Sequence, residues 1–286
     1  MCPILFKWGS LRIGSYGLLL ACAFLGAIFI TNRQFRKFQA DINLAWDIYL
    51  LAILGGLIGS RALFLIEVWP SFMKNPYETF FSGAGFSVIG GYLLAIFLCY
   101  YRVKKAGEKF WRMADICTPG LAIGYAIGRL GCITAGDGCY GIPSVLPWAM
   151  TFPNGLVPTL SAKNTQLVQL FKELFPNTPI PSDIPVHPTP LYESLSHFLL
   201  LFLLLKGDWN VGTGRRFAFF LGWFGISRFF VEFIRLNPKW WLGLTSDQWL
   251  SIGLMIASVI IVFYVPRLNQ EKEKIEKEPA KSDSLP

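Results

Sequence analysis

IYLLAILGGLIGSRALFLIEV, residues 48–68, is an apolar run about as long as the hydrocarbon core of a bilayer is thick. Its only basic residue is Arg61, and its only acidic residue, Glu67, stands next to its end. Runs of similar character lie at residues 13–30, 80–101, 113–132, 190–205, 217–233 and 249–265. We therefore predict an all-α integral membrane protein with seven transmembrane helices.

The composition of the whole chain agrees with a membrane location. Of its 286 residues, 53% are hydrophobic and 15% are charged, whereas soluble domains carry about a quarter charged residues. The formal charge of +8 could suggest nucleic acid as a partner. The Lys and Arg residues gather in loops rather than on one amphipathic face, however, so we expect no nucleic-acid binding.

The loop charges predict the orientation. Residues 31–47, 102–112 and 206–216 together hold eleven Lys or Arg residues. The loops of residues 68–79 and 234–248 hold three. By the positive-inside rule, the N-terminus is outside and the C-terminus is cytoplasmic. An odd number of spans requires the same arrangement, so we expect a multi-pass membrane protein.

Two segments lie outside the predicted spans. The proline-rich stretch of residues 134–189 is expected to form a small extracytoplasmic cap inserted into the transmembrane domain of residues 1–268. Within it, residues 165–175 carry a helical apolar stripe that packs either inside the cap or on the bilayer surface. Residues 269–286 alternate charges without an apolar face, so they predict a disordered cytoplasmic tail.

Charged residues inside a span need a partner or a function. With the predicted orientation, the polar residues of the spans share the outer half of the membrane, although neighbouring helices run in opposite directions. A transporter would need such residues to continue into the cytoplasmic half, and the sequence has none there. The residues in this outer group are Tyr16, Arg61, Arg129, His187, Tyr192, Glu193, Arg228, Glu232 and Arg235.

Three of these residues share one helix face. Arg228, Glu232 and Arg235 have i, i+4, i+7 spacing, so Glu232 is expected to neutralise one arginine and to leave the other free for an anion. Guanidinium groups match phosphate oxygens in bidentate geometry, which favours a phosphate ligand. The alternative is structural: Arg61 pairs with Glu67 or a carbonyl, and the arginines reach to the interface.

Glycines and a histidine complete the candidate set. Gly128 and Gly131 surround Arg129, and Gly90 with Gly91 forms a similar pair; such density permits close approach of a helix or a ligand. His187 precedes a predicted helix, where it serves either as a general base or as a hydrogen-bonding cap. His197 lies one turn further inside and is expected to pack or to form a hydrogen bond between helices.

The six cysteines show no metal-binding spacing. Four lie in or beside apolar runs, where cysteine behaves as a small hydrophobic residue. Cys132 and Cys139 fall near the predicted outer surface, so packing and a disulfide in an oxidising compartment both stay open for them.

With these residues assembled, the chain resembles the prolipoprotein diacylglyceryl transferase family over nearly its whole length. GRLG followed by HPxxLYE and RxxVExxR is the most specific combination. The motifs that carry the resemblance are SYG (residues 15–17), GSR (59–61), GFSVIGG (85–91), GRLG (128–131), HPTPLYE (187–193) and RFFVEFIR (228–235).

The resemblance implies transfer of the diacylglyceryl group of phosphatidylglycerol to the lipobox cysteine thiol of a prolipoprotein, the first step of bacterial lipoprotein maturation. It implies no metal or organic cofactor, and we expect a monomer. The expected catalytic residues are Arg129, Arg228, His187 and Tyr16. The expected substrate-binding residues are Arg61, Gly90, Gly91, Gly128, Gly131, Tyr192, Glu193, Glu232 and Arg235.

The chain also departs from the family pattern. Gly14 and Ile89 stand where many members have histidine, and Cys132 stands where asparagine is expected. Both an active branch and a silent paralogue that binds phospholipid or signal peptides fit such changes. Retention of both central arginines favours the active branch.

Overall fold

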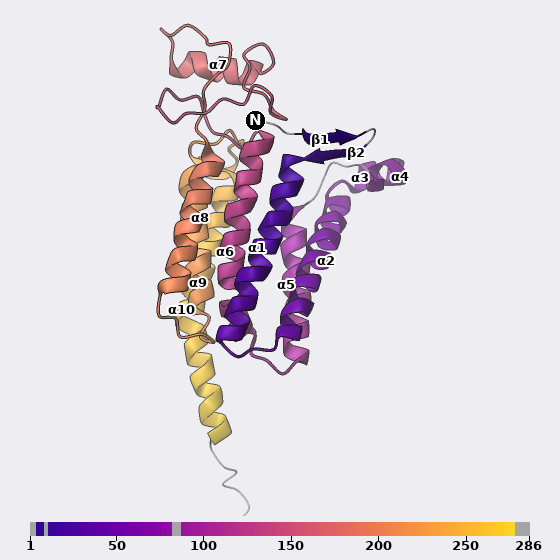
Figure 1. Ribbon diagram of the computed structural model, residues 1–286, viewed down its shortest axis with the longest axis vertical. Helices are drawn as coiled ribbons and strands as arrows, with labels where there is room; N and C mark the ends of the chain where they lie inside the picture. Colours follow the sequence, from indigo (N-terminus) through magenta and orange to yellow (C-terminus); the bar gives the residue numbers. More distant parts are fainter. Residues whose placement is uncertain (1–3, 9–10, 82–86, 278–286) are drawn as a thin grey trace, which may run out of the picture. The chain divides into compact units, whose positions relative to one another are not determined.

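The computed structural model describes residues 4–8, 11–81 and 87–277, and helices dominate them (Figure 1). The chain divides into two compact units: residues 1–30 with 117–286 form unit 1, and residues 31–116 form unit 2. The first two residues of the GFSVIGG motif, Gly85 and Phe86, lie outside the described residues.

Each of the seven apolar runs overlaps a long helix. These helices are α1 (Ser15–Lys37), α2 (Ile42–Glu67), α5 (Val88–Lys105), α6 (Phe110–Ala135), α8 (Thr189–Lys206), α9 (Arg215–Glu232) and α10 (Ser246–Lys277). Within the described part of the chain, α1, α2, α6 and residues 246–265 of α10 are long and apolar enough to cross a membrane, which makes four candidate spans. The shorter helices are α3 (Trp69–Lys74), α4 (Pro76–Phe81), α7 (Thr165–Leu174) and the 3-10 helix η1 (Trp241–Gly243).

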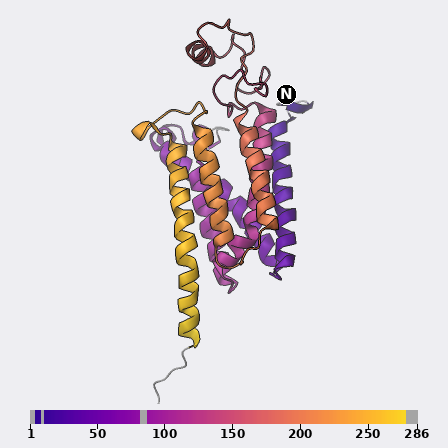
Figure 2. The same cartoon turned by 90° about the vertical axis from the view of Figure 1, so that its left-hand side faces the viewer.

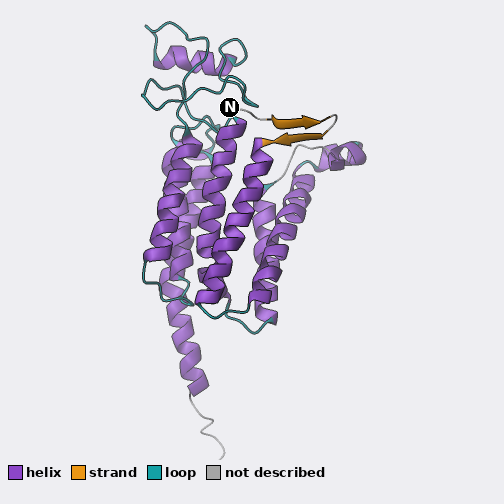
Figure 3. Cartoon of the chain, viewed as in Figure 1, coloured by secondary structure: helices purple, strands orange, loops and turns teal. Residues whose placement is uncertain are grey.

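The chain also contains a β-hairpin, which the all-α prediction lacked (Figure 3). Strand β1 (Ile4–Trp8) pairs antiparallel with β2 (Leu11–Gly14), with Lys7 opposite Arg12. The predicted first span began at Ile13, but that residue belongs to β2 and the helix begins at Ser15. Branched and aromatic residues favour strands, which accounts for the difference.

Two further helix ends differ from the expectation. The run predicted from Phe80 is a helix only from Val88, and Phe80 itself belongs to α4. Helix α10 continues to Lys277, into the stretch expected to be disordered from Asn269. Glu, Lys and Gln are strong helix formers, so their density favours this extension.

In unit 1, α9 lies beside both α8 and α10 in the two views (Figures 1 and 2). Leu200, Leu204 and Phe220 form an apolar core between α8 and α9, joined by Ala122 of α6. Helix α1 contacts α6 closely, since a Cβ at Gly26 would lie 3.2 Å from Cδ1 of Ile127. These contacts fix the helices that carry the polar residues.

The segment between α6 and α8 has a core of its own. Leu167 and Phe171 of α7 are almost completely buried in it. Of the two alternatives for the α7 stripe, packing within the segment is therefore confirmed. The other buried core residues are Tyr140, Phe152, Ile184 and Val186.

In unit 2, α2 and α5 pack backbone to backbone. A Cβ at Gly90 would come within 2.3 Å of the carbonyl oxygen of Gly59, and one at Gly91 within 2.9 Å of that of Gly56. Since real Cβ atoms do not approach so closely, helix packing by itself requires glycine at both positions.

Candidate functional site

The centre of the candidate site is the carboxylate of Glu193, near the start of α8. Its side chain is 1% exposed. Arg228 Nη1 of α9 donates to Oε1 at 2.8 Å, and Arg129 Nε of α6 lies 3.1 Å from Oε2. The structure thus brings together two arginines that are distant in sequence, on one buried acid.

Tyr125 of α6 joins this group and was missed in the sequence analysis. Its hydroxyl donates to Glu193 Oε1 at 3.0 Å and accepts from Arg129 Nε and Nη2 at 2.9 and 2.8 Å. Tyr125 lies one turn before Arg129, and this i, i+4 spacing is the signal that could have identified it. The ring of His197 packs on Tyr125 at 4.3 Å, so the packing role expected for His197 is confirmed.

A second acid cluster lies at the other side of Arg228. Arg228 Nη2 contacts Asp247 Oδ2, in the first turn of α10, and lies 3.5 Å from Glu232 Oε2. Glu232 Oε2 is also 3.8 Å from Arg235 Nε, and Asn237 donates to Oε1 of the same carboxylate. Asp247 and Asn237 were missed, because neither belongs to the α9 face.

The prediction that Glu232 leaves one arginine of this group free is wrong. Arg129, Arg228 and Arg235 are balanced by three carboxylates, those of Glu193, Glu232 and Asp247. The sequence spacing revealed only Glu232, since the other two acids come from different helices. Without a ligand, the three arginines therefore pair with carboxylates. An anion would bind beside these ion pairs or displace Asp247, whose side chain is 35% exposed.

His187 and Tyr192 form a separate polar pair. His187 Nδ1 lies 3.2 Å from the Tyr192 hydroxyl, which also accepts from Trp148 Nε1 at 2.9 Å. Burial lowers the pKa of His187 below its usual 6.5. The imidazole is therefore neutral at pH 7 and able to accept a proton.

Two backbone hydrogen bonds place His187 next to the end of α9. Gly141 N donates to His187 O at 2.9 Å, and Ile142 N donates to Ile234 O at 2.8 Å. Gly141 also pairs with Arg235 as an isolated antiparallel bridge. A Cβ at Gly141 would lie 2.3 Å from Ile234 O, so glycine is required here.

Tyr16 lies in the first turn of α1 and is 43% exposed. Its ring packs on Gly131, where a Cβ would come within 3.2 Å of Tyr16 Cδ2. A Cβ at Gly128, by contrast, would meet no heavy atom of the described residues within 4 Å. Close packing therefore favours glycine at 131 and leaves open space at 128.

Cys132, at the end of α6, lies beside Cys139 and Asp137 of the following loop. Both cysteines are free, so the disulfide alternative is not realised. The two sulfurs and an Asp137 carboxylate oxygen lie within 4.8 Å of one another, a grouping that the sequence spacing did not reveal. A hydrogen bond from the Cys132 thiol lowers the pKa of Cys139 to about 7.

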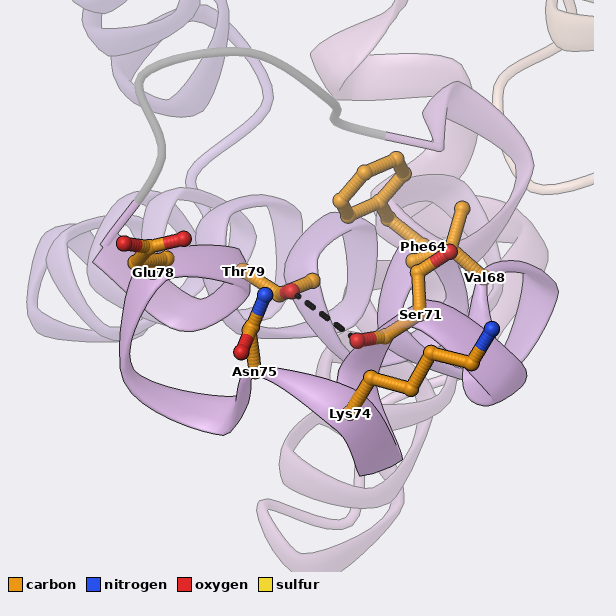
Figure 4. Close-up of a pocket in the computed structure, with 7 residues that line it drawn as sticks. All are labelled: Phe64, Val68, Ser71, Lys74, Asn75, Glu78 and Thr79. Atoms are coloured by element: carbon orange, nitrogen blue, oxygen red, sulfur yellow. Dashed lines mark hydrogen bonds between the residues drawn. The ribbon is translucent and has the colours of Figure 1, made fainter.

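Arg61, Gly90 and Gly91 belong to unit 2. Arg61 Nη2 donates to the carbonyl of Thr79 at 2.8 Å and contacts that of Phe80. The carbonyl alternative for Arg61 is therefore confirmed, and Glu67 instead accepts from Ser87 Oγ at 2.8 Å. A neighbouring pocket is lined by residues of α2, α3 and α4, including Lys74 and Glu78, and Thr79 contacts Ser71 across it (Figure 4).

Comparisons with known proteins bear on what this arrangement does. A family model described as prolipoprotein diacylglyceryl transferase matches residues 3–264. The chain is 28% identical over 274 residues to a phosphatidylglycerol–prolipoprotein diacylglyceryl transferase of Clostridium tetani, covering 95% of this chain and 100% of that protein. It is 30% identical over 275 residues to the protein of that name in Finegoldia magna, covering 95% and 99% of the two chains.

Proposed function

The chain belongs to the prolipoprotein diacylglyceryl transferase family, and we infer that it transfers the diacylglyceryl group of phosphatidylglycerol to the lipobox cysteine of prolipoproteins. It is an enzyme of lipoprotein modification, as its full-length relatives are named. The observation that carries the residue assignment is the meeting of Arg129 and Arg228 on Glu193.

The two arginines would hold the phosphate of the lipid. The thiolate of the acceptor attacks the glyceryl carbon, a C–S bond forms, and the C–O bond breaks with its electron pair on the phosphate oxygen. Glycerol phosphate leaves with more negative charge than the phosphodiester carried. Guanidinium groups held in position stabilise that developing charge, and Glu193 keeps both in place before the lipid binds.

The remaining candidates have supporting roles. His187, neutral at pH 7, would accept the proton of the acceptor thiol, since the thiolate is the nucleophile. Tyr16 is exposed at the start of α1, and Tyr192 orients His187 through its hydroxyl. The open space beside Gly128 would let the lipid approach Arg129 closely.

We further propose the membrane arrangement. All seven long helices would span a bacterial inner membrane, with the N-terminus outside, residues 134–189 as an extracytoplasmic cap on the domain of residues 1–268, and the tail of residues 269–286 inside. Support comes from the four candidate spans and from α5, α8 and α9, helices of 18 residues each that overlap the three remaining apolar runs. The enzyme would act as a monomer.

The test uses purified protein in phosphatidylglycerol vesicles with a lipobox peptide, and it follows the peptide mass. We expect addition of diacylglycerol by the wild type and by Arg102→Ala, whose ion pair with Asp47 is half-exposed. Arg129→Ala and Arg228→Ala should lose roughly 10²–10³-fold in rate, as when an oxyanion donor is removed. A wild type that binds the lipid but leaves the peptide unmodified would instead identify a silent phospholipid binder.

A further inference from the structure

Arg228 of α9 is paired with two acids that differ in how firmly they are held. Its Nη1 donates to Glu193 Oε1 at 2.8 Å, and the Glu193 side chain is 1% exposed. Its Nη2 contacts Asp247 Oδ2, and the Asp247 side chain is 35% exposed. One end of the guanidinium group thus contacts a buried carboxylate, and the other end contacts a carboxylate that solvent reaches.

The other contacts of the two acids show the same difference. Glu193 also accepts from the Tyr125 hydroxyl at 3.0 Å and from Arg129 Nη2 at 3.2 Å. Within the described part of the chain, the carboxylate of Asp247 has one further contact, to Asn237 Nδ2 at 3.5 Å, which is long for a hydrogen bond. The side chain of Asp247 can therefore turn away at the loss of two contacts, whereas Glu193 is held by three donors.

We propose that Asp247 is a displaceable counter-anion: it occupies the place of the lipid phosphate on Arg228 Nη2, leaves it when phosphatidylglycerol binds, and returns to expel glycerol phosphate. The inference rests on the proposed transfer reaction, in which this arginine holds the phosphate. Carboxylate and phosphate oxygens bind the same guanidinium fork, so the two anions compete for one donor. Because Nη1 stays on Glu193, the arginine keeps its position during the exchange.

The charges of the cluster favour this exchange. In the free protein, the three arginines of the cluster are balanced by the carboxylates of Glu193, Glu232 and Asp247. A bound phosphodiester carries one negative charge, so it replaces the charge of Asp247 and leaves the balance unchanged. The cluster therefore takes up the lipid headgroup without burying an uncompensated charge, which would be costly.

The product disturbs this balance. Glycerol phosphate is a phosphomonoester with a second pKa of about 6, so it carries nearly two negative charges at pH 7. In the place of Asp247, it gives the cluster about one negative charge in excess. Asp247, in the first turn of α10, repels this extra charge and competes for Arg228. Return of the carboxylate to the arginine restores the balance and releases the product, and no covalent bond changes in either step.

The test measures binding of glycerol phosphate to the purified protein by titration calorimetry. Asp247→Asn should bind it roughly 10-fold more tightly than the wild type, because a charge-assisted hydrogen bond of Arg228 becomes free for the ligand. Glycerophosphoglycerol, a soluble phosphodiester, should gain less, since it carries less negative charge. In the vesicle assay, the KM for phosphatidylglycerol should fall while kcat does not rise. Asp247→Ser, which also lacks the carboxylate, is a second variant for the same measurements.

Three further variants serve as controls. Asp47→Asn removes another half-exposed carboxylate that is paired with an arginine, and it should leave binding unchanged. Glu193→Gln removes the buried acid of Arg228 and should weaken binding, because the arginines lose the group that holds them. Asp247→Glu should restore the wild-type affinity, since a carboxylate again competes for the arginine.

Failure of the inference is distinguishable from failure of the function. Glycerol phosphate that binds Asp247→Asn and Asp247→Ser no more tightly than the wild type overturns the inference. If that wild type transfers diacylglycerol, the proposed function stands. Tighter binding by both variants, without any transfer by the wild type, supports the exchange of anions at Arg228 and overturns the proposed function.

Discussion

Arg228 on α9 donates to the carboxylate of Glu193 on α8 at 2.8 Å, deep in a cluster where the acid's side chain is 1% exposed. The same carboxylate holds Arg129 of α6. Three helices are therefore tied by one acid. Its removal tests both the stability of the fold and the positioning of the arginines.

We expect Glu193→Gln to destabilise the protein by about 3–5 kcal/mol, because two buried cations lose their shared partner. Transfer should fall as well, since the guanidinium groups are no longer held together. Thermal unfolding in detergent measures the first effect and peptide mass the second. Glu173→Gln, on the exposed side of α7, is the control, and equal melting of the two variants would contradict this account.

Replacement of arginine by lysine separates charge from geometry. Arg129→Lys and Arg228→Lys keep the positive charge but lose the planar fork that contacts two oxygens at once. We expect both variants to fold. Each should lose at least about 10-fold in transfer rate, because at least one charge-assisted hydrogen bond is lost. Full activity of either variant would show that charge alone suffices at that position.

Two glycines of one helix give opposite predictions. Gly128→Ala should be neutral or stabilise the fold by up to about 1 kcal/mol, because alanine favours helix and the space is open. Gly131→Ala meets the Tyr16 ring at 3.2 Å, so strain of about 1–3 kcal/mol offsets this gain. Comparison of the two melting temperatures checks the pair, and an equal gain in both would contradict the packing of Tyr16.

The state of His187 predicts a pH dependence. Burial lowers its pKa below 6.5, so the folded protein binds this proton less readily than the unfolded chain does. The stability it contributes is complete above pH 6.5 and is lost as the pH falls toward the folded pKa. If His187 accepts the thiol proton, the transfer rate should decline as the pH falls through the lowered pKa of the folded protein, and His187→Gln should remove that decline together with most of the activity.

Arg61 is predicted to hold local structure. Arg61→Met keeps the stem but removes the donor to the carbonyls of Thr79 and Phe80. We expect faster amide hydrogen exchange in α3 and α4, with exchange in α9 unchanged. Unchanged exchange in α4 would contradict this role.

The long helices could be predicted because each requires only an apolar run of sufficient length, a local property of the sequence. The hairpin could not, since its strands are short and β2 continues directly into α1. The end of α10 could not be predicted either, because alternating charges without an apolar face are typical of a solvated tail, although Glu and Lys favour helix.

The site was predictable to the extent that it follows helix periodicity. Arg228 and Glu232 could be placed on one face of α9, whereas Arg235 follows the end of the helix and Asp247 joins the cluster only through the packing of α10 against α9. Charge balance therefore depended on contacts between helices, which explains why a free arginine was expected. The grouping of Cys132 with Cys139 depends likewise on the turn at Gly136 and Gly138.

Residues 141 and 142 have hydrogen bonds on two sides, to His187 before α8 and to Ile234 after α9. A movement of these two residues would act on both neighbours at once. His187 and Arg235, which follows the end of α9, are thus linked through the same two residues. Any displacement of Gly141 and Ile142 would therefore move His187 and the chain that follows α9 together.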